Sequence, residues 1–360
     1  MAALQAAANK VIEEQAEALT QYPGNLGHAG MRAAMAQREE DREGIRIDPN
    51  HLLLTNGSMQ GVTLTAEALQ ENHGDTVLVE EYCYPGTLSA YRSLKYDMVG
   101  IPLDEGGMCP DAVERELDRL HKKKRLPRFI YTISTYQNPT GFVMPKARRL
   151  QIIEMAKHYG VPIVEDNCYA DVHYDGPLEP AFYALDDDPN QIYLCSLSKI
   201  LAPGLRVGWL ESRPDRLNDL ANLGWVNSGG AVNQWGSLLV ARMLEDQVVS
   251  PILAQIRQTL STRANLMHEG LSASLGELAN WHKPSGGYFF WIELKANIDT
   301  QQTLPAIRAK GVGYQPGVTF SAEDQFHSAF RLSYAAYPES KITEGLAILG
   351  QSLKDVVSGR

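Results

Sequence analysis

The sequence predicts an α/β protein with a large domain, built on a mostly parallel doubly wound sheet, and a smaller α+β domain. From residue 52 to 211, short apolar runs alternate with segments of helical periodicity, which is the pattern of parallel strands covered on both faces. A long amphipathic pattern then begins at residue 233 and is followed by only a few strand-like runs. A chain of 360 residues is also longer than one core usually holds, so two domains are expected.

The first element is expected to be a helix, because residues 1–20 place apolar side chains at helical spacing among alanines and acids. This segment lacks the basic flank and apolar core of a signal peptide. Residues 145–159 also have helical periodicity. Short apolar runs predict buried strands at 52–55, 76–80, 129–133, 162–165, 191–195 and 207–210.

The second part of the chain predicts a separate domain. The amphipathic pattern from 233 to about 275 should leave the large domain, and the runs 287–292 and 331–334 are strand-like. We therefore expect three units along the chain: an N-terminal helix that packs with the small domain at 1–22, a large ligand-binding domain at 23–245 and a small C-terminal domain at 246–360.

The composition argues against several classes of protein. A formal net charge of −10 disfavours nucleic acid as a partner, because phosphate backbones bind positive surfaces. The four cysteines are far apart and form no Cys-x-x-Cys pair, so neither a metal site nor a disulfide framework is expected. A reducing, cytoplasmic location fits this usage. No segment is apolar over the length that a bilayer requires, so no membrane association is expected.

The most informative stretch is 196–209, which places Lys199 between hydroxyls and an arginine directly after an apolar strand. A lysine amine attacks an aldehyde only when part of it is unprotonated, and nearby positive charge with partial burial favours that state. Arg206 supplies the charge, and its planar guanidinium matches the oxygens of a phosphate. Ser196 and Ser198 add hydroxyl groups. The stretch therefore predicts a Schiff-base lysine beside a phosphate site.

Two further strand ends add to this site. The turn Gly57-Ser58-Met59 follows the first strand and opens a helix, so its backbone amides predict an anion site at the positive end of the helix dipole. Asp166 follows the strand at 162–165, and open α/β sheets bind ligands at the carboxyl ends of their strands. A carboxylate there can pair with a protonated ring nitrogen of a cofactor. A lone Asp at a strand end can also be a helix cap, so the assignment depends on the whole set of residues.

These motifs resemble those of the class I and II aminotransferases, which are fold-type I enzymes dependent on pyridoxal 5'-phosphate. The stretch 196–209 resembles the family's lysine motif, and 166–169 resembles its Asp-x-x-Tyr motif. Residues 138–141 are similar to its Asn-Pro-Thr-Gly turn, and 228–233 suggest the branch of the aromatic and 2-aminoadipate aminotransferases. Relatives usually carry a longer N-terminal arm, whereas this chain begins at the helix. The resemblance makes 23–245 the cofactor-binding domain.

The resemblance implies a role for each matching residue. Lys199 would bond to the cofactor and act as general base, with Asp166 and Tyr84 as the other catalytic residues. Tyr84 would stack on the cofactor ring, while Asn138 and Tyr169 would bind its phenolate oxygen. The implied cofactor-binding set is Gly57, Ser58, Met59, Tyr84, Asn138, Asp166, Tyr169, Ser196, Ser198, Lys199, Arg206 and Tyr22.

Two more roles concern the substrate and the assembly. Arg331, in Arg-Leu-Ser-Tyr, would bind the α-carboxylate of the amino acid together with Asn138. Tyr22 would reach the cofactor phosphate of a neighbouring subunit, so the resemblance implies a homodimer with shared active sites.

The implied function is transfer of an amino group from an α-amino acid to a 2-oxo acid through an external aldimine. The same chemistry supports β- or γ-replacement, or carbon–carbon bond formation on a larger amino acid, and the motifs leave this alternative open. A nicotinamide dehydrogenase would need a Gly-x-Gly-x-x-Gly run after a strand, and none is present. A regulator with an aminotransferase-like domain would carry a DNA-binding domain before it, and we expect no room for one.

Overall fold

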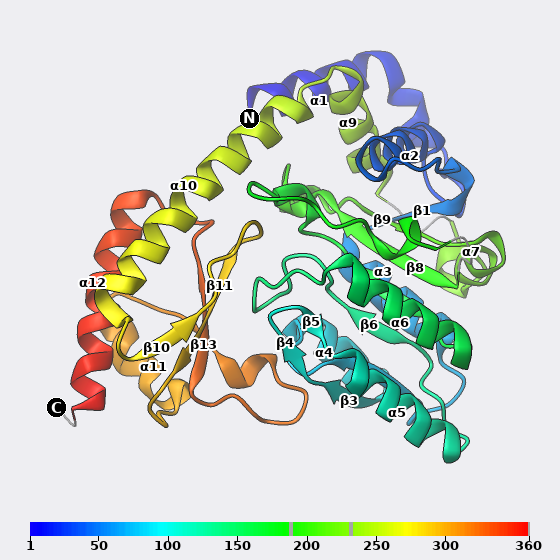
Figure 1. Ribbon diagram of the computed structural model, residues 1–360. Helices are drawn as coiled ribbons and strands as arrows, with labels where there is room; N and C mark the ends of the chain where they lie inside the picture. The colour runs from blue at the N-terminus through cyan, green and yellow to red at the C-terminus, as the bar shows by residue number, and fades with distance from the viewer. Residues whose placement is uncertain (187–189, 230–232, 359–360) are drawn as a thin grey trace.

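The protein has a large and a small lobe joined by one long helix (Figure 1). The computed structural model describes residues 1–186, 190–229 and 233–358. Residues 230–232 belong to the stretch 228–233 that suggested the family branch, and they lie outside the described residues.

The large lobe is built on a seven-stranded sheet in the order β1-β9-β8-β7-β6-β2-β3. Pairs from β3 to β8 are parallel, whereas β9 is antiparallel to both of its neighbours. The predicted α/β fold with a mostly parallel sheet is therefore confirmed. Its strands are β1 (Leu52–Thr55), β2 (Thr76–Glu80), β3 (Asp97–Ile101), β6 (Ile130–Thr132), β7 (Ile163–Asp166), β8 (Gln191–Ser196) and β9 (Gly208–Glu211).

The edge strand β3 was not predicted from the sequence. Most of its residues are exposed or half-buried, so it lacks the continuous apolar run that marks the central strands. A short hairpin of β4 (Leu103–Asp104) and β5 (Gly107–Met108) follows it.

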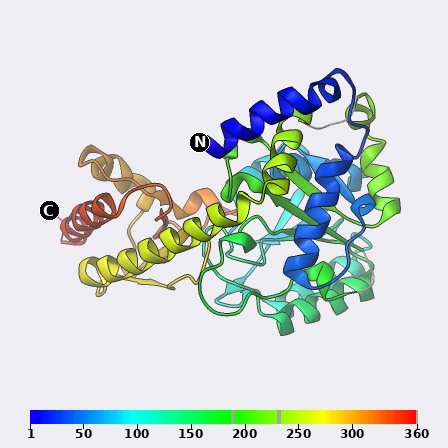
Figure 2. The same ribbon diagram turned by 90° about the horizontal axis from the view of Figure 1, so that it is seen from above.

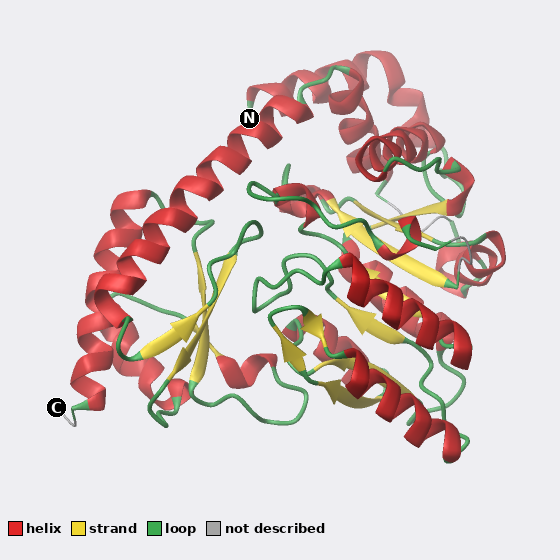
Figure 3. Ribbon diagram, in the orientation of Figure 1, coloured by secondary structure: helices red, strands yellow, loops and turns green. Residues whose placement is uncertain are grey.

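Helices cover both faces of the large sheet, as a doubly wound fold requires (Figure 3). Alternate residues of the strands point to opposite faces, so Leu78 packs with the α5 and α6 side while Val77 and Val79 join the core on the other side. The helices of this lobe are α2 (Ala29–Glu43), α3 (Ser58–Leu69), α4 (Pro85–Ser93), α5 (Pro110–Lys122), α6 (Lys146–Tyr159), α7 (Pro214–Ala221), α8 (Gly224–Asn227) and α9 (Gln234–Glu245).

The N-terminal helix α1 (Ala2–Gln15) packs through Ala7 and Val11 against α9 and the first turn of α10. A short 3-10 helix, η1, continues it over Ala16–Thr20. The contact therefore lies at the junction of the two lobes, and the division at residues 22 and 245 stays a prediction.

The amphipathic pattern from residue 233 forms two helices, α9 and α10. Gln247 adopts a left-handed conformation with φ of 54°, which ends α9 and redirects the chain into α10 (Val249–Leu275). This helix is 27 residues long, starts beside α1 and α9, and ends in the small lobe (Figure 2).

The small lobe contains an antiparallel four-stranded sheet in the order β10-β11-β13-β12. Figure 1 shows α10 and α12 side by side on the outer face of this lobe. Its elements are β10 (Ala279–Trp281), β11 (Phe289–Leu294), α11 (Thr300–Ala309), β12 (Gln315–Pro316), β13 (Ala329–Ser333) and α12 (Glu339–Val357).

Two features are absent from the residues that the structure describes. Within residues 1–186, 190–229 and 233–358, no helix has the length and apolar character needed to cross a membrane. The same ranges hold no group of three or more His, Cys, Asp or Glu side chains arranged to bind a metal ion.

Leu194 tests the core of the large lobe. It is fully buried on β8 and packs so closely on Gly61 of α3 that a β-carbon at Gly61 would lie 2.9 Å from Leu194 Cδ2. We expect Leu194→Ala to lower the free energy of unfolding by about 2–5 kcal/mol, because the cavity cannot collapse fully. Urea titration would measure the loss. Leu150→Ala is the control, because Leu150 is 37% exposed on α6 and should change stability by under about 0.5 kcal/mol.

Candidate active site

The lysine lies in a short 3-10 helix, η5 (Leu197–Lys199), directly after β8. Ser196 Oγ caps this helix by accepting a hydrogen bond of 3.4 Å from Ser198 N. Lys199 Nζ lies 5.4 Å from the ring centre of Tyr169 and 5.9 Å from that of Tyr288. Among the described residues it has neither a hydrogen-bond nor an ion-pair partner, so the amine is available to a ligand.

Asp166 ends the neighbouring strand β7 and is buried. Tyr131 donates a hydrogen bond of 3.0 Å to Oδ2, whereas Oδ1 has no hydrogen-bond partner within the described part of the chain. Burial raises the pKa of Asp166, and Cys168, Tyr131 and the Lys199 charge offset part of the rise. A buried acceptor without a partner is costly, so this oxygen is suited to a donor on a ligand.

Asn138 connects the two lobes. Its Nδ2 donates to the hydroxyl of Tyr169 at 3.3 Å, and its Oδ1 accepts from Arg331 Nη1 at 2.7 Å. Asn138 lies in a loop of the large lobe, whereas Arg331 lies on β13 of the small lobe. The structure thus brings the predicted residues Asn138, Tyr169 and Arg331 together.

Aromatic rings surround the Arg331 guanidinium, whose carbon lies 3.9 Å from the ring centre of Phe289 and 4.9 Å from that of Phe320. Burial lowers the pKa of Arg331, and Tyr169 and Tyr84 oppose this effect, which places Tyr84 at the same site. Arg331 Nε is buried without a partner among the described residues. An unpaired buried cation is suited to an anionic ligand.

A tight backbone cradle adjoins the lysine. Gly57 caps α3 with φ of 82°, and a β-carbon there would lie 2.5 Å from Arg206 Nη2. Arg206 Nη2 donates to the carbonyl of Asn56 at 2.8 Å. Gly208 packs equally closely, since its β-carbon would lie 2.8 Å from the carbonyl carbon of Gly57. Ser58 and the following Met59 start α3, so a helix N-terminus and a guanidinium meet at one anion site.

Tyr22 is the predicted residue that the chain does not bring into this cluster. Its side chain is 82% exposed, and a β-carbon at Gly229 would lie 2.9 Å from its ring. Within one chain, Tyr22 therefore lies on the surface beside α8.

The arrangement fits a group with an aldehyde, a basic ring nitrogen and a phosphate. Within the described ranges, Lys199 offers an amine without a partner and Asp166 offers an unsatisfied buried oxygen. Arg206 with the α3 N-terminus offers an anion site. Arg331 provides a separate site for an anion on the opposite lobe. These are the features that pyridoxal phosphate and an amino acid substrate require.

The comparison with protein families decides the assignment. The model of the family "Aminotransferase class I and II" matches residues 2–349. The chain belongs to this family.

Similar proteins agree with the family match. The chain is 33% identical over 347 residues to aromatic-amino-acid aminotransferase 1 of Thermococcus litoralis, covering 96% of this chain and 82% of the relative. It is 30% identical over 357 residues to the 2-aminoadipate transaminase of Thermus thermophilus, covering 98% and 86%.

Solved structures agree as well. The multiple substrate aminotransferase of Thermococcus profundus superposes with a TM-score of 0.93 at 30% identity, covering 99% of this chain and 88% of that one. The α-aminoadipate aminotransferase of Thermus thermophilus, complexed with N-(5'-phosphopyridoxyl)-L-leucine, gives 0.90 at 29% identity and covers 99% and 89%. The predicted family, fold type and cofactor are thus confirmed, as is amino-group transfer. The alternative of replacement or carbon–carbon bond formation gains no support from these relatives.

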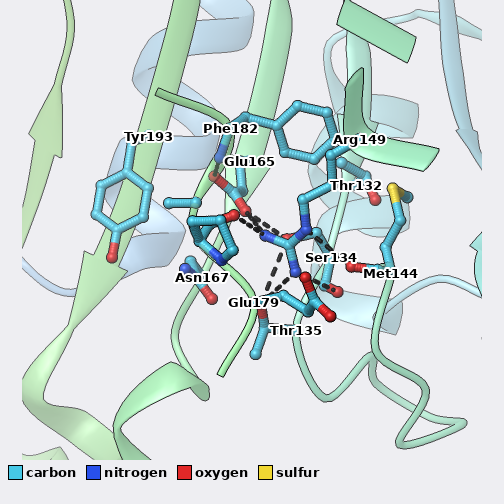
Figure 4. A network of polar contacts seen from close by, with 12 residues as sticks. Thr132, Ser134, Thr135, Met144, Arg149, Glu165, Asn167, Glu179, Phe182 and Tyr193 are labelled. Carbon is cyan, nitrogen blue, oxygen red and sulfur yellow. Dashed lines mark hydrogen bonds and ion pairs between the residues drawn. The ribbon is translucent and has the colours of Figure 1, made fainter. Parts of the chain in front are cut away.

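The active site of this aminotransferase is held by a buried arginine on α6 (Figure 4). Arg149 is fully buried, and all its nitrogens donate hydrogen bonds. Nη1 also forms an ion pair of 3.1 Å with Glu165 Oε1, next to Asp166. The acceptors are the carbonyl oxygens of Met144, Pro180 and Ser134, Thr135 Oγ1 and Glu165 Oε1. Arg149 therefore connects the end of β7 to both ends of the loop that carries Asn138.

A second buried network holds the Asn138 loop from β2. Glu80 accepts hydrogen bonds of 2.6 Å from Thr132 Oγ1, 3.0 Å from Ile133 N and 2.9 Å from Gln137 Nε2. Gln137 Oε1 in turn accepts from Thr140 N at 2.9 Å. Because no cation pairs with Glu80 within the described ranges, burial raises its pKa to about 8 despite these donors.

Sequence reasoning missed four residues of this site: Arg149, Glu80, Tyr131 and Tyr288. Glu80 and Tyr131 lie within predicted strands, and a charged residue in a buried strand is a usable signal, because such residues are rarely buried without partners. Arg149 follows another arginine in a predicted helix and gives no such signal. Tyr288 lies within the predicted strand-like run 287–292, and only the packing of the two lobes brings it to Lys199.

Glu80 predicts a pH dependence of stability. Its folded-state pKa of about 8 exceeds the usual value of 4.5, so the folded state binds the proton more tightly. The protonation of Glu80 stabilises the folded state below pH 4.5, and this stabilisation is lost as the pH rises to about 8. The free energy of unfolding should fall over this range by an amount on the order of a few kcal/mol. We expect Glu80→Gln to reduce the fall in stability between pH 5 and 8, measured by urea titration at each pH. The surface variant Glu114→Gln should keep the wild-type pH profile, and an unchanged profile in Glu80→Gln would contradict the assignment.

Proposed function

We propose that the predicted site residues perform amino transfer from an α-amino acid to a 2-oxo acid in this protein. The observation that carries the proposal is a set of groups at one place that lack hydrogen-bond partners among the described residues: the Lys199 amine and two buried atoms, Asp166 Oδ1 and Arg331 Nε. When bound, pyridoxal phosphate supplies an electron sink for the charge left at the substrate α-carbon. Lys199 Nζ would act as the general base that removes the proton from that carbon.

Each partner of Lys199 has a defined task in this proposal. Asp166 Oδ1, which has no hydrogen-bond partner among the described residues, would hold a proton on the ring nitrogen. Asn138 and Tyr169, already joined by a hydrogen bond, orient the ring oxygen. Tyr84 covers the ring. The phosphate is held by Gly57, Ser58, Met59, Ser196, Ser198 and Arg206.

The substrate side of the site favours a large amino acid. Arg331 binds the carboxylate while Asn138 fixes one of its nitrogens. The rings of Phe289 and Phe320 lie against the Arg331 guanidinium, and Tyr84 lies at the same site, so the surroundings of the carboxylate site are aromatic. Relatives are named as aromatic-amino-acid and 2-aminoadipate aminotransferases, which also act on large amino acids.

The functional unit is a homodimer in which Tyr22 completes the partner's phosphate site. Tyr22 is 82% exposed and lies near other exposed aromatic side chains, Trp225 at 44% and Trp235 at 37%. Hydrogen bonds join these segments: Asn25 Nδ2 donates to Asn227 Oδ1 at 3.0 Å, and Gln234 Nε2 donates to the carbonyl of Ala18 at 3.4 Å. Exposed aromatic surface of this kind is typical of protein interfaces.

A cytoplasmic role in amino acid biosynthesis completes the proposal. The cytoplasmic location is supported by Cys83, Cys109, Cys168 and Cys195, all of which are free thiols and three of which are buried.

Asp166→Asn tests the role of the ring-nitrogen partner. The amide keeps the shape of the side chain but no longer favours a protonated ring. Loss of one charge-assisted hydrogen bond of roughly 1.5–3 kcal/mol should lower kcat about 10- to 100-fold while the cofactor stays bound. Steady-state kinetics and the absorbance of the bound cofactor would measure both effects. Asp118→Asn on the surface of α5 should match the wild type, and near-normal turnover in Asp166→Asn would remove it from this role.

Hybrid dimers test the sharing of sites. Tyr22→Ala and Lys199→Ala should each be inactive alone, since each lacks a residue needed by every site. In a mixed dimer, one site combines Tyr22 from one chain with Lys199 from the other. Random mixing in equal amounts should therefore restore about a quarter of the wild-type activity. A monomeric wild type by light scattering, or no recovery after mixing, would contradict the shared site.

A further inference from the structure

Tyr288 reaches from the small lobe to the backbone of the lysine turn. It directly precedes β11, and its hydroxyl donates a hydrogen bond to the carbonyl oxygen of Lys199. No other hydrogen bond to this carbonyl occurs within the described ranges. The Tyr288 ring meets the ring of Tyr169 edge-on at 5.9 Å, and Lys199 Nζ lies close to both ring centres, at 5.4 Å from Tyr169 and 5.9 Å from Tyr288.

The loop that carries Tyr288 is anchored on the large lobe. Gly287 N donates to the carbonyl of Val172 at 3.1 Å, and Tyr174 N donates to that of Ser285 at 3.2 Å. Gly287 has φ of 72°, and a β-carbon there would lie 2.8 Å from Tyr136 Cβ. The backbone at Gly287 therefore approaches the large lobe as closely as glycine allows. This contact holds the backbone from which the Tyr288 side chain extends.

The hydroxyl of Tyr288 stays a donor under working conditions. Burial raises the pKa of Tyr288 to about 12, so the group keeps its proton at neutral pH. A tyrosine hydroxyl that is half-buried needs an acceptor, and the lysine carbonyl fills this need. The contact is thus a directed hydrogen bond between the lobes and not only ring packing.

We propose that Tyr288 is a positioning residue that fixes the backbone of Lys199, and so the place of its amine, when the small lobe is seated on the large lobe. The inference rests on the proposed role of Lys199 as the reacting amine. Without the hydroxyl, the η5 turn is held only from the large lobe, and the amine can shift along the cofactor ring. Displacements of about 1 Å at a reacting group can lower rates on the order of 100-fold.

The test compares Tyr288→Phe with Tyr314→Phe in the holoenzyme. Both changes remove one hydroxyl from a small-lobe tyrosine that donates to a carbonyl, but Tyr314 donates to Thr300 at 2.8 Å within its own lobe. In Tyr288→Phe, we expect backbone amide exchange over residues 197–206 to rise about 2- to 10-fold, as loss of one hydrogen bond predicts. We also expect kcat to fall about 10-fold or more with KM within about twofold, and the pH titration of the lysine-bound cofactor band to shift. Tyr314→Phe should match the wild type in all three.

Tyr288→Leu separates the hydroxyl from the ring. If Tyr288→Phe matches the wild type in exchange and titration while only Tyr288→Leu differs, the ring packs but the hydroxyl does not position Lys199, and the proposal is wrong. If the proposed function is wrong, the result is different: the wild-type protein would then show no cofactor band on Lys199 and no amino transfer. Amide exchange over 197–206 needs neither substrate nor turnover, so it tests the Tyr288 contact in either case.

Discussion

Burial of the Arg149 guanidinium is the constraint on which the active site depends. A buried charge of this kind is tolerated only if its donors are all satisfied, and its five acceptors lie on four different segments around the ends of β6 and β7. These segments cannot move independently without leaving a donor unpaired. Removing one partner of such a pair typically costs about 3–5 kcal/mol, so the geometry is strongly defined. As a result, Asn138 and Asp166 hold fixed positions relative to each other.

Three buried carboxylates at the ends of β2 and β7 have different roles, because the contacts around each carboxylate, and not burial alone, set its charge state and its binding. Glu165 is paired with Arg149 and is structural. Glu80 has hydrogen-bond donors but no cation among the described residues, so its pKa rises to about 8. Asp166 keeps one oxygen without a hydrogen-bond partner in the described part of the chain, which leaves this oxygen available to a ligand. A buried carboxylate can therefore stabilise its surroundings, change its protonation with pH or bind a ligand, according to the contacts around it.

Much of the fold followed from pattern alone. Central strands such as β2 and β8 are buried on both faces, so their sequences are continuously apolar and their bounds could be predicted within a residue or two. The edge strand β3 lacks this signal, and the break at Gln247 between α9 and α10 gives none, because a left-handed residue other than glycine depends on its context.

The sequence by itself determined the family, the cofactor and the residues near it, because short motifs such as 196–209 and 166–169 place reactive groups at fixed spacing from strand ends. Tertiary structure decided what supports those groups. Arg149 and Glu80 act through contacts with segments tens of residues away, and Tyr288 reaches Lys199 across two lobes. Such contacts depend on how helices and lobes pack, and residue spacing along the chain carries no record of that packing.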